Sequence, residues 1–264
     1  MQETFKFKKK FGQNFLKDKN IVNKIVNSVD ILSNSLVIEV GCGDGRLTKE
    51  LCKKYSQVLG YEIDNQVISR LRKNVEIYDN VEIIEDDFLN RDIVNDISKY
   101  KDKNIYVVAN LPYYITSPII EKIISSDIDI LQMIIMVQKE VGDRFCAKPG
   151  TKEYNSLTVY LNYNYDVKKL FIVDRNSFVP SPNVDSVVMS FLKKDKIFLK
   201  DKEHFYKLIR DSFRFKRKTL KNNLFDYDLN KIKEVLIKYN LDLSIRAEQI
   251  PLDIFCDISN NLSI

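Results

Sequence analysis

The chain has 264 residues, of which 44% are hydrophobic, and a net charge of +5, so it can build one sizeable core and a small second unit. Its four cysteines are scattered without paired spacing, which argues against a disulfide framework or a zinc site and is typical of a reducing cytoplasm. No apolar run approaches membrane-spanning length. Because the chain has only one histidine, His204, a mechanism that uses histidine as a general base is not expected.

Short apolar runs alternate with amphipathic segments through the first part of the chain. We expect strands at 36–40, 57–61, 81–85, 104–109, 132–137, 169–173 and 186–192. We expect helices at 20–29, 46–54, 65–74 and 117–125. This alternation predicts an α/β fold with a mostly parallel sheet. The last two strands have no helix between them and are expected to pair antiparallel.

After residue 192 the pattern changes. Residues 193–202 form a charged connector, and residues 204–262 repeat apolar and charged positions at helical spacing. The sequence therefore predicts two domains, an α/β domain over 1–194 and a small all-α domain over 195–264.

Positive charge is concentrated in two segments. Residues 1–20 carry six lysines and two acids, and residues 193–221 carry twelve lysines and arginines and four acids, which leaves the rest of the chain negative. Two basic segments on an acidic body indicate a polyanion partner. The lysines near the N-terminus can also be read as ordinary solvated side chains. The second segment is more specific, because SFRFKRKTLKNNL interleaves Phe213 and Phe215 with cations.

A glycine loop follows the first expected strand in IEVGCGDGRLT. The spacing G-x-G-x-G differs from the dinucleotide pattern, and no Gly-Lys-Ser/Thr follows, which excludes a P-loop. Glu62 lies 21 residues after Gly41, near the spacing at which an acid binds ribose hydroxyls, and Asp86 or Asp87 ends the third strand near an adenine ring. Together these strand ends favour S-adenosylmethionine, which has an adenosine but no phosphate. The alternative is that the glycines only form a turn.

The stretch NLPYYITSP follows the fourth strand. The exocyclic nitrogen of adenine is a poor nucleophile, and the Asn110 side-chain oxygen and the Leu111 carbonyl can accept its two N–H bonds. Pro112 fixes the turn, and Tyr113 can stack on a base that has been taken out of its own stack. No metal is required. The alternative is a capped strand end with two core tyrosines.

With these motifs the sequence resembles the ribosomal RNA adenine dimethyltransferase family, in its bacterial small-subunit branch. The resemblance covers nearly the whole chain and includes KKKFGQNFLKD, IEVGCGDGRLT, YEID, DDFL, NLPYYITSPII, AKPGTKEYNSLTV, FVPSPNVDSVV, SFRFKRKTLKNNL and RAEQI. It implies a Rossmann-like seven-stranded methyltransferase domain with a small C-terminal helical domain that binds rRNA. It also implies S-adenosylmethionine-dependent transfer of two methyl groups to N6 of each of two adjacent adenines, in the 3′-terminal hairpin of small-subunit rRNA.

The resemblance assigns roles to residues that match the family motifs. Cofactor binding is implied for Asn14, Leu16, Gly41, Gly43, Glu62, Ile63, Asp87, Phe88 and Asn110. Catalysis is implied for Asn110, Leu111, Pro112, Tyr113 and Phe178, with Phe178 stacking on the target base opposite Tyr113 unless it is simply a buried aromatic. RNA binding is expected for Lys8, Lys9, Lys10, Arg214, Lys216, Arg217 and Lys218. The implied partner is rRNA in a pre-30S or 30S particle, with no metal and no membrane, and the implied state is a cytoplasmic monomer.

The chain departs from the family pattern at a few positions. Cys42 stands where proline is usual, Asp44 and Arg46 replace small or apolar residues, and Asn155 replaces a glycine. Cys42 can be read as a reactive thiol or, more simply, as a small filler. These departures can change the backbone path of the loops, but none of them removes a side chain to which a role is assigned.

Three other readings compete. An Erm-type enzyme would dimethylate large-subunit rRNA, but such proteins tend to read NIPY and lack the FVPSPNVDS and KRKTLKNNL pairing. A non-catalytic assembly factor would not need Asn110, Tyr113 and Glu62 together. A DNA adenine methyltransferase would need a large target-recognition domain, for which this chain has no room.

Overall fold

The computed structural model describes residues 14–30 and 32–263. Within them the chain separates into two compact units. The first runs up to Gly142 and resumes over Lys168–Lys193, and the second comprises Asp143–Val167 and the chain from Lys194 onward. We describe each unit by itself.

The first unit is built on a seven-stranded sheet, with the strand order β4-β3-β2-β5-β6-β9-β7. Its strands are β2 (Ser35–Val40), β3 (Gln57–Tyr61), β4 (Val81–Ile84), β5 (Asn104–Asn110), β6 (Ile130–Gln138), β7 (Tyr165–Val173) and β9 (Ser186–Lys193). The pairs from β4 through β6 are parallel, and β9 is antiparallel to β6. The predicted α/β fold with a mostly parallel sheet is therefore confirmed, and β7 and β9 are neighbours as expected.

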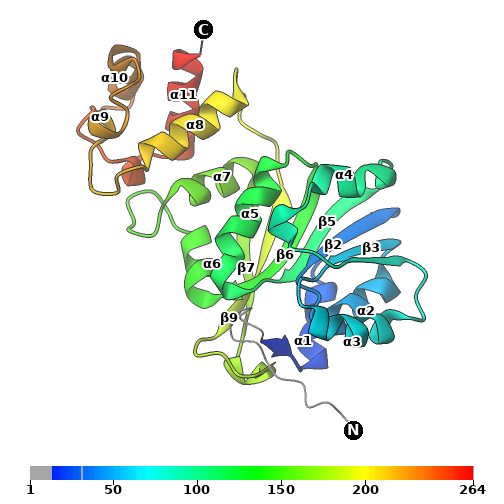
Figure 1. Cartoon of the computed structure of the whole chain (residues 1–264). Coiled ribbons are helices and arrows are strands. Elements are labelled where there is room, and N and C mark those ends of the chain that lie inside the picture. Colours follow the sequence, from blue (N-terminus) through cyan, green and yellow to red (C-terminus); the bar gives the residue numbers. More distant parts are fainter. Residues whose placement is uncertain (1–13, 31, 264) are drawn as a thin grey trace. The chain divides into compact units, whose positions relative to one another are not determined.

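Helices cover both faces of this sheet. They are α1 (Lys19–Val26), α2 (Arg46–Lys54), α3 (Asn65–Val75), α4 (Ile93–Ile97) and α5 (Thr116–Ser125), followed by α6 (Lys139–Phe145) at the end of the segment. Figure 1 shows α1, α2 and α3 together on one face, and α4 and α5 on the other. Asp18 and Asp64 begin α1 and α3 by accepting hydrogen bonds from backbone N–H groups in the first turn.

The central strands are buried on both faces, as expected for a parallel sheet that is covered by helices. Since β2, β3, β4 and β5 are parallel, their carboxyl ends meet at one edge, where open α/β sheets bind ligands. A separate two-stranded ribbon, which the sequence analysis did not predict, pairs β1 (Phe15–Leu16) with β8 (Phe178–Val179).

The second unit is helical, with α7 (Ser156–Asn164), α8 (Lys202–Ser212), α9 (Leu220–Asn223), α10 (Leu229–Lys238) and α11 (Leu252–Leu262). One apolar cluster joins them and includes Tyr154, Val159 and Tyr163 from the segment before β7. The prediction places that segment in the α/β domain, whereas its side chains here pack with the helices of the second unit. Asn155 begins α7, because its side-chain oxygen accepts from Leu157 and Thr158 N–H, and this accounts for the departure at that position.

Across residues 14–30 and 32–263, none of the helices is both long and apolar enough to cross a membrane.

Candidate active site

The glycine loop connects β2 to α2 through three residues with positive φ, which are Gly41 (77°), Gly43 (56°) and Gly45 (82°). A side chain at Gly43 would meet the Phe15 ring at 2.8 Å. The loop is anchored because the Gly41 and Cys42 N–H groups both donate to the Tyr61 carbonyl at the end of β3, at 2.8 and 3.2 Å. The loop thus keeps its backbone open toward the strand ends, where a ligand can approach closely.

Cys42 occupies space that the chain leaves empty at Gly60. A methyl group at Gly60 would lie 2.5 Å from the Cys42 sulfur and 2.9 Å from Ile83. Burial raises the pKa of the Cys42 thiol, and the side chain is 5% exposed. These features favour the filler interpretation of Cys42 over a reactive thiol.

Glu62 places its carboxylate beside the glycine loop. Its two oxygens accept hydrogen bonds from Gly43 N–H at 2.7 Å and from Asp64 N–H at 2.8 Å. The side chain is 6% exposed, and this burial raises its pKa. A carboxylate fixed by two backbone donors keeps further lone pairs with which it can accept from ligand hydroxyls.

The far end of the pocket combines carboxylates with aromatic surface. Asp87 follows β4 and accepts from Leu89 N–H at 2.9 Å through one oxygen. Phe88 is 4% exposed, and its ring meets that of Tyr61 edge to face at 5.0 Å between centroids. This wall offers apolar contact to a flat ring and a carboxylate that can accept from an amino group.

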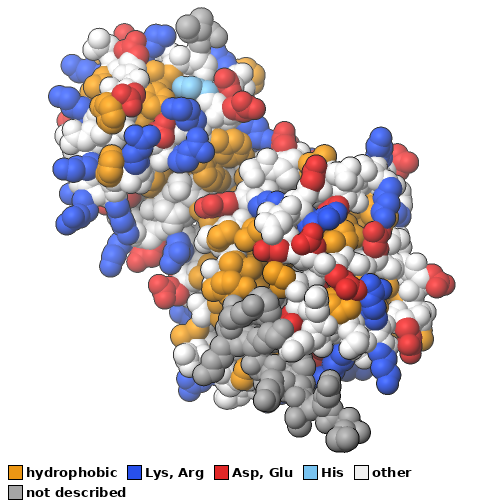
Figure 2. All heavy atoms as spheres, viewed as in Figure 1, with side chains coloured by type: hydrophobic (Ala, Val, Ile, Leu, Met, Phe, Trp, Pro, Cys, Tyr) orange, Lys and Arg blue, Asp and Glu red, His pale blue; other side chains and the backbone are white. Residues whose placement is uncertain are grey.

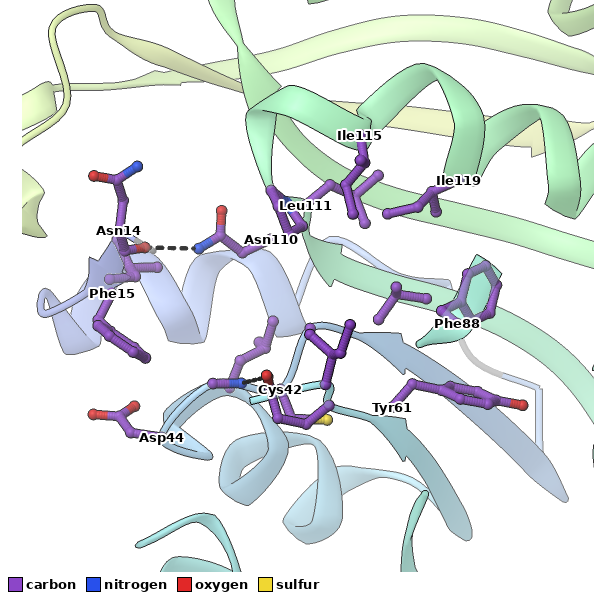
Figure 3. Close-up of a pocket in the computed structure, with 18 of the residues that line it drawn as sticks. Asn14, Phe15, Cys42, Asp44, Tyr61, Phe88, Asn110, Leu111, Ile115 and Ile119 are labelled. Carbon is purple, nitrogen blue, oxygen red and sulfur yellow. Dashed lines mark hydrogen bonds between the residues drawn. The ribbon is translucent and has the colours of Figure 1, made fainter. Parts of the chain in front are cut away.

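Asn110 ends β5 and turns its amide toward β1. Its Nδ2 donates to the Asn14 carbonyl at 3.3 Å, and Figure 3 shows this hydrogen bond between the two residues. Because a carbonyl can only accept, the atom of Asn110 that faces Asn14 must be the amide nitrogen. The Asn110 Oδ1 is consequently left to accept from another donor.

The residues after Asn110 form a rigid turn. The Pro112 carbonyl accepts from Ile115 N–H at 3.3 Å and from the Thr116 hydroxyl at 3.1 Å. Leu111 N–H donates to the Met136 carbonyl at 3.2 Å, and no residue in the described part of the chain donates to the Leu111 carbonyl. The Tyr113 hydroxyl lies 2.7 Å from the Ser186 hydroxyl, while the Tyr114 ring is 56% exposed.

These strand ends surround one pocket. Every sequence-predicted cofactor residue lines it, as do Leu111, Pro112 and Tyr113, so the structure brings together Asn14, Leu16, Gly41, Gly43, Glu62, Ile63, Asp87, Phe88, Asn110, Leu111, Pro112 and Tyr113. It adds Phe15, Arg46, Tyr61, Tyr114, Ile115 and Ile119, which the sequence analysis did not assign. Among these, Arg46 forms an ion pair with Asp44 at 3.1 Å and donates to the Leu16 carbonyl at 3.2 Å.

Phe178 does not line this pocket. Its side chain is 1% exposed and belongs to the buried cluster that contains Leu16 and Val22, and its strand β8 pairs with β1. In this conformation Phe178 is therefore a buried aromatic residue, as the alternative in the sequence analysis describes. A stacking role requires the ring to leave this cluster when RNA binds, and it stays a prediction.

The predicted RNA-binding residues fall in two separate segments of the chain. Lys8, Lys9 and Lys10 lie outside the described residues. Arg214, Lys216, Arg217 and Lys218 lie in the second unit, where all four are exposed in the loop between α8 and α9.

The groups that line the pocket match S-adenosylmethionine. Carboxylates at Glu62 and Asp87 suit the ribose hydroxyls and the adenine amino group, and the Tyr61 and Phe88 rings suit the adenine face. Among the described residues that line the pocket, Arg46 is the only lysine or arginine, and it is already paired with Asp44, so these residues offer little positive charge to a pyrophosphate. No group of three or more metal-binding side chains is found in the described part of the chain.

The site combines three features, which are a glycine loop after the first sheet strand, an acid at the end of the next strand and an Asn-Leu-Pro-Tyr turn. Together they define an S-adenosylmethionine-dependent methyltransferase that acts on an amino group. The model of the family Ribosomal RNA adenine dimethylase matches residues 4–263. The chain belongs to this family, and it is an rRNA adenine dimethyltransferase.

Named relatives agree with this assignment. Ribosomal RNA small subunit methyltransferase A of Streptococcus gordonii is 41% identical over 98% of this chain and 92% of its own length, and that of Bacillus mycoides is 40% identical with the same coverage. A dimethyladenosine transferase from Plasmodium falciparum superposes with a TM-score of 0.74 at 29% identity, covering 92% of this chain and 95% of that one. The 23S rRNA methyltransferase ErmE shares the fold, with a TM-score of 0.71 at 23% identity over 95% of this chain and 100% of its own.

Proposed function

We propose that this chain dimethylates N6 of two adjacent adenines in the 3′-terminal hairpin loop of small-subunit rRNA, and so acts in the biogenesis of the small ribosomal subunit. The substrate is a pre-30S or 30S particle, and the enzyme acts in the cytoplasm as a monomer without a metal. The full-length relatives at 40–41% identity carry the small-subunit name, which supports the choice of substrate.

One observation carries the proposal most directly, and it is the orientation of the Asn110 amide. With Nδ2 engaged by the Asn14 carbonyl, Oδ1 can accept one N–H of the target adenine, and the Leu111 carbonyl can accept the other. Two acceptors hold the amino group in place and favour a pyramidal nitrogen whose lone pair is free to attack. A monomethylated adenine keeps one N–H, which can donate to one of the two acceptors, so a second transfer is possible in the same pocket.

Other residues bind and position the reactants. When bound, S-adenosylmethionine supplies the methyl group that is transferred. Glu62 accepts from its ribose hydroxyls, Asp87 accepts from its adenine amino group, and the loop at Gly41 and Gly43 lets its methionine part lie against the backbone. Tyr113, held by Ser186, stacks on the flipped target base.

Positive charge in two segments of the chain binds the RNA. Arg214, Lys216, Arg217 and Lys218 are exposed and contact phosphates, together with Lys8, Lys9 and Lys10 of the N-terminal segment. Binding of this kind supplies affinity rather than sequence selection, and it weakens as salt rises.

The proposal is tested by measuring transfer of labelled methyl groups from S-adenosylmethionine to purified small and large ribosomal subunits that lack adenine dimethylation. We expect label in the small-subunit rRNA only. Label in the large-subunit rRNA would instead favour the Erm-type activity. Tight binding to small subunits without transfer would favour a non-catalytic assembly factor.

A further inference from the structure

The two aromatic side chains between α8 and α9 lie in different environments. Phe213 points into the second unit, where its ring lies 6.1 Å from the rings of both Tyr154 and Phe255. Phe215, two residues later, is 51% exposed. Of the two phenylalanines interleaved with cations in the sequence, one therefore belongs to the core and the other faces solvent.

The backbone of Phe215, which carries the exposed ring, is held in place by hydrogen bonds. The buried side chain of Asn223, 3% exposed, accepts from Phe215 N–H at 3.0 Å and donates to the Phe215 carbonyl at 3.3 Å. The same carbonyl accepts from Lys218 N–H at 2.9 Å. Three hydrogen bonds to the backbone of one residue fix the point from which the ring projects into solvent before any partner arrives.

Positive charge surrounds the ring. Arg214 is held by Asp211, which is itself fixed by Lys207 and by the Tyr227 hydroxyl at 2.7 Å. Burial alone would raise the pKa of Asp211, but the hydrogen bonds from Lys207 and Tyr227 lower it below its ordinary value, so this anchor stays ionised. By contrast, Lys216, Arg217 and Lys218 have no acidic partner within the described residues. Figure 2 shows lysine and arginine side chains over much of the visible face of this unit.

We propose that Phe215 is a stacking platform for an unpaired nucleobase of the RNA whose phosphates the neighbouring cations bind. Single-stranded nucleic acid is commonly held by a positively charged surface with aromatic rings on which bases stack. An exposed ring on a fixed backbone between exposed cations has this chemistry, whereas a protein partner would find an isolated ring in a strongly basic loop. This inference rests on the proposed function, since it requires that the basic loop contacts rRNA.

The test compares binding of the full-length protein and its variants to unmethylated small subunits at several KCl concentrations. We expect Phe215→Ala to weaken binding about five- to hundredfold at every concentration, since base stacking on an aromatic ring has this magnitude. The slope of log affinity against log salt should not change, because no phosphate contact is lost. Lys216→Ala should instead make that slope shallower by about one.

Two matched variants separate stacking from simple exposure. Phe215→Trp keeps an aromatic face and should retain binding. Phe225→Ala removes another exposed ring of the same unit, 59% exposed and followed by Asp226, and should bind like the wild type. Thermal unfolding of Phe215→Ala should match that of the wild type, because the ring is not part of the core.

Unchanged affinity in Phe215→Ala overturns the platform, as does an equal loss in Phe215→Trp or Phe225→Ala. A loss seen with particles but absent with deproteinised small-subunit rRNA overturns it in favour of a protein contact. A wild-type protein that neither binds nor methylates the particle overturns the proposed function and the platform together. Normal methylation by the wild type with an unaffected Phe215→Ala variant overturns the platform alone.

Discussion

The Tyr113 hydroxyl lies 2.7 Å from the Ser186 hydroxyl, and this contact ties the Asn-Leu-Pro-Tyr turn to the first residue of β9. Ser186 is fully buried and lies opposite Gln138, at the end of β6. Burial raises the pKa of Tyr113, so its hydroxyl stays protonated at neutral pH. The orientation of the ring next to Asn110 thus depends on a side chain more than 70 residues away in sequence.

Ser186→Ala should therefore lower kcat several-fold while the affinity for S-adenosylmethionine stays near that of the wild type. The change removes the partner of a largely buried hydroxyl, which typically costs about 1–3 kcal/mol, and lets the ring reorient. Tyr113→Phe with Ser186→Ala should be hardly worse than Ser186→Ala alone. Steady-state kinetics on small subunits check this, with Ser190→Ala in the same strand as the control. Additive losses in the double variant would remove the contact from its positioning role.

Asn110→Ala should lower kcat about a hundredfold or more, while the affinity for S-adenosylmethionine falls only a few-fold. An orienting group of this kind contributes to the transition state more than to cofactor binding. Calorimetric titration with the cofactor and single-turnover methyl transfer separate the two effects. Asn104→Ala, at the opposite end of β5, is the control. Near-normal turnover in Asn110→Ala would exclude Asn110 as the acceptor.

Glu62→Gln should weaken binding of S-adenosylmethionine about tenfold or more. Both Glu62 oxygens accept from backbone N–H groups, so an amide NH2 at that place would face a donor and leave it unpaired. Glu50→Gln changes a partly buried acid on α2 that is paired with Lys53, and it should bind the cofactor normally. An unchanged dissociation constant in Glu62→Gln would contradict the ribose assignment.

Because of Glu39, we expect the free energy of unfolding to depend on pH in an unusual way. It lies buried in β2 below the glycine loop, and its Oε2 has no hydrogen-bond partner among the described residues. Burial raises its pKa from 4.5 to about 8, and the nearby carboxylates of Glu62 and Asp44 act in the same direction. Between these pH values the folded protein holds a proton that the unfolded chain has lost, so the free energy of unfolding falls as pH rises through this window.

Glu39→Gln removes this proton linkage. The variant should gain stability over the wild type progressively from pH 5 to pH 8, by an amount on the order of a few kcal/mol, and the difference should level off above pH 8. Urea unfolding of both proteins across this range measures it, and taking the difference between them cancels the other titrating groups. A difference that does not vary with pH would show that Glu39 is ionised in the folded protein.

A triple variant should bind small subunits more weakly and with less salt dependence, while its affinity for S-adenosylmethionine is unchanged. In this variant alanine replaces Lys216, Arg217 and Lys218. Three exposed cations without described acidic partners are free to contact phosphates. The matched control is Lys231, Lys233 and Lys238 changed to alanine, which removes the same charge from α10 of the same unit. Equal loss in both triple variants would point to net charge rather than to this loop.

The sheet, its order of elements and most of the pocket could be predicted, because strand periodicity and strand-end motifs are local in sequence. The parallel strands then bring Gly41, Glu62, Asp87 and Asn110 to one edge, as the topology of such sheets requires. Asn14 and Leu16 were placed by family resemblance alone.

What could not be predicted depends on contacts between distant segments. The ribbon of β1 and β8 has two residues in each strand, too few to show a period, and it buries Phe178, which does not line the pocket. Because side chains alternate along β1, the Phe15 ring lies over Gly43. This contact can be predicted only once the strand is known. The segment around α7 resembles the rest of the α/β domain in composition, and only the packing of Tyr154 and Val159 places it with the helices.

The central claim is tested most directly by mapping the product. Small subunits that lack adenine dimethylation are incubated with the wild-type protein and S-adenosylmethionine, and the rRNA is digested and sequenced by mass. We expect N6,N6-dimethyladenosine at two adjacent adenines of the 3′-terminal hairpin, and none with Asn110→Ala. Unmodified adenines in that hairpin after incubation with an enzyme that binds S-adenosylmethionine would contradict it.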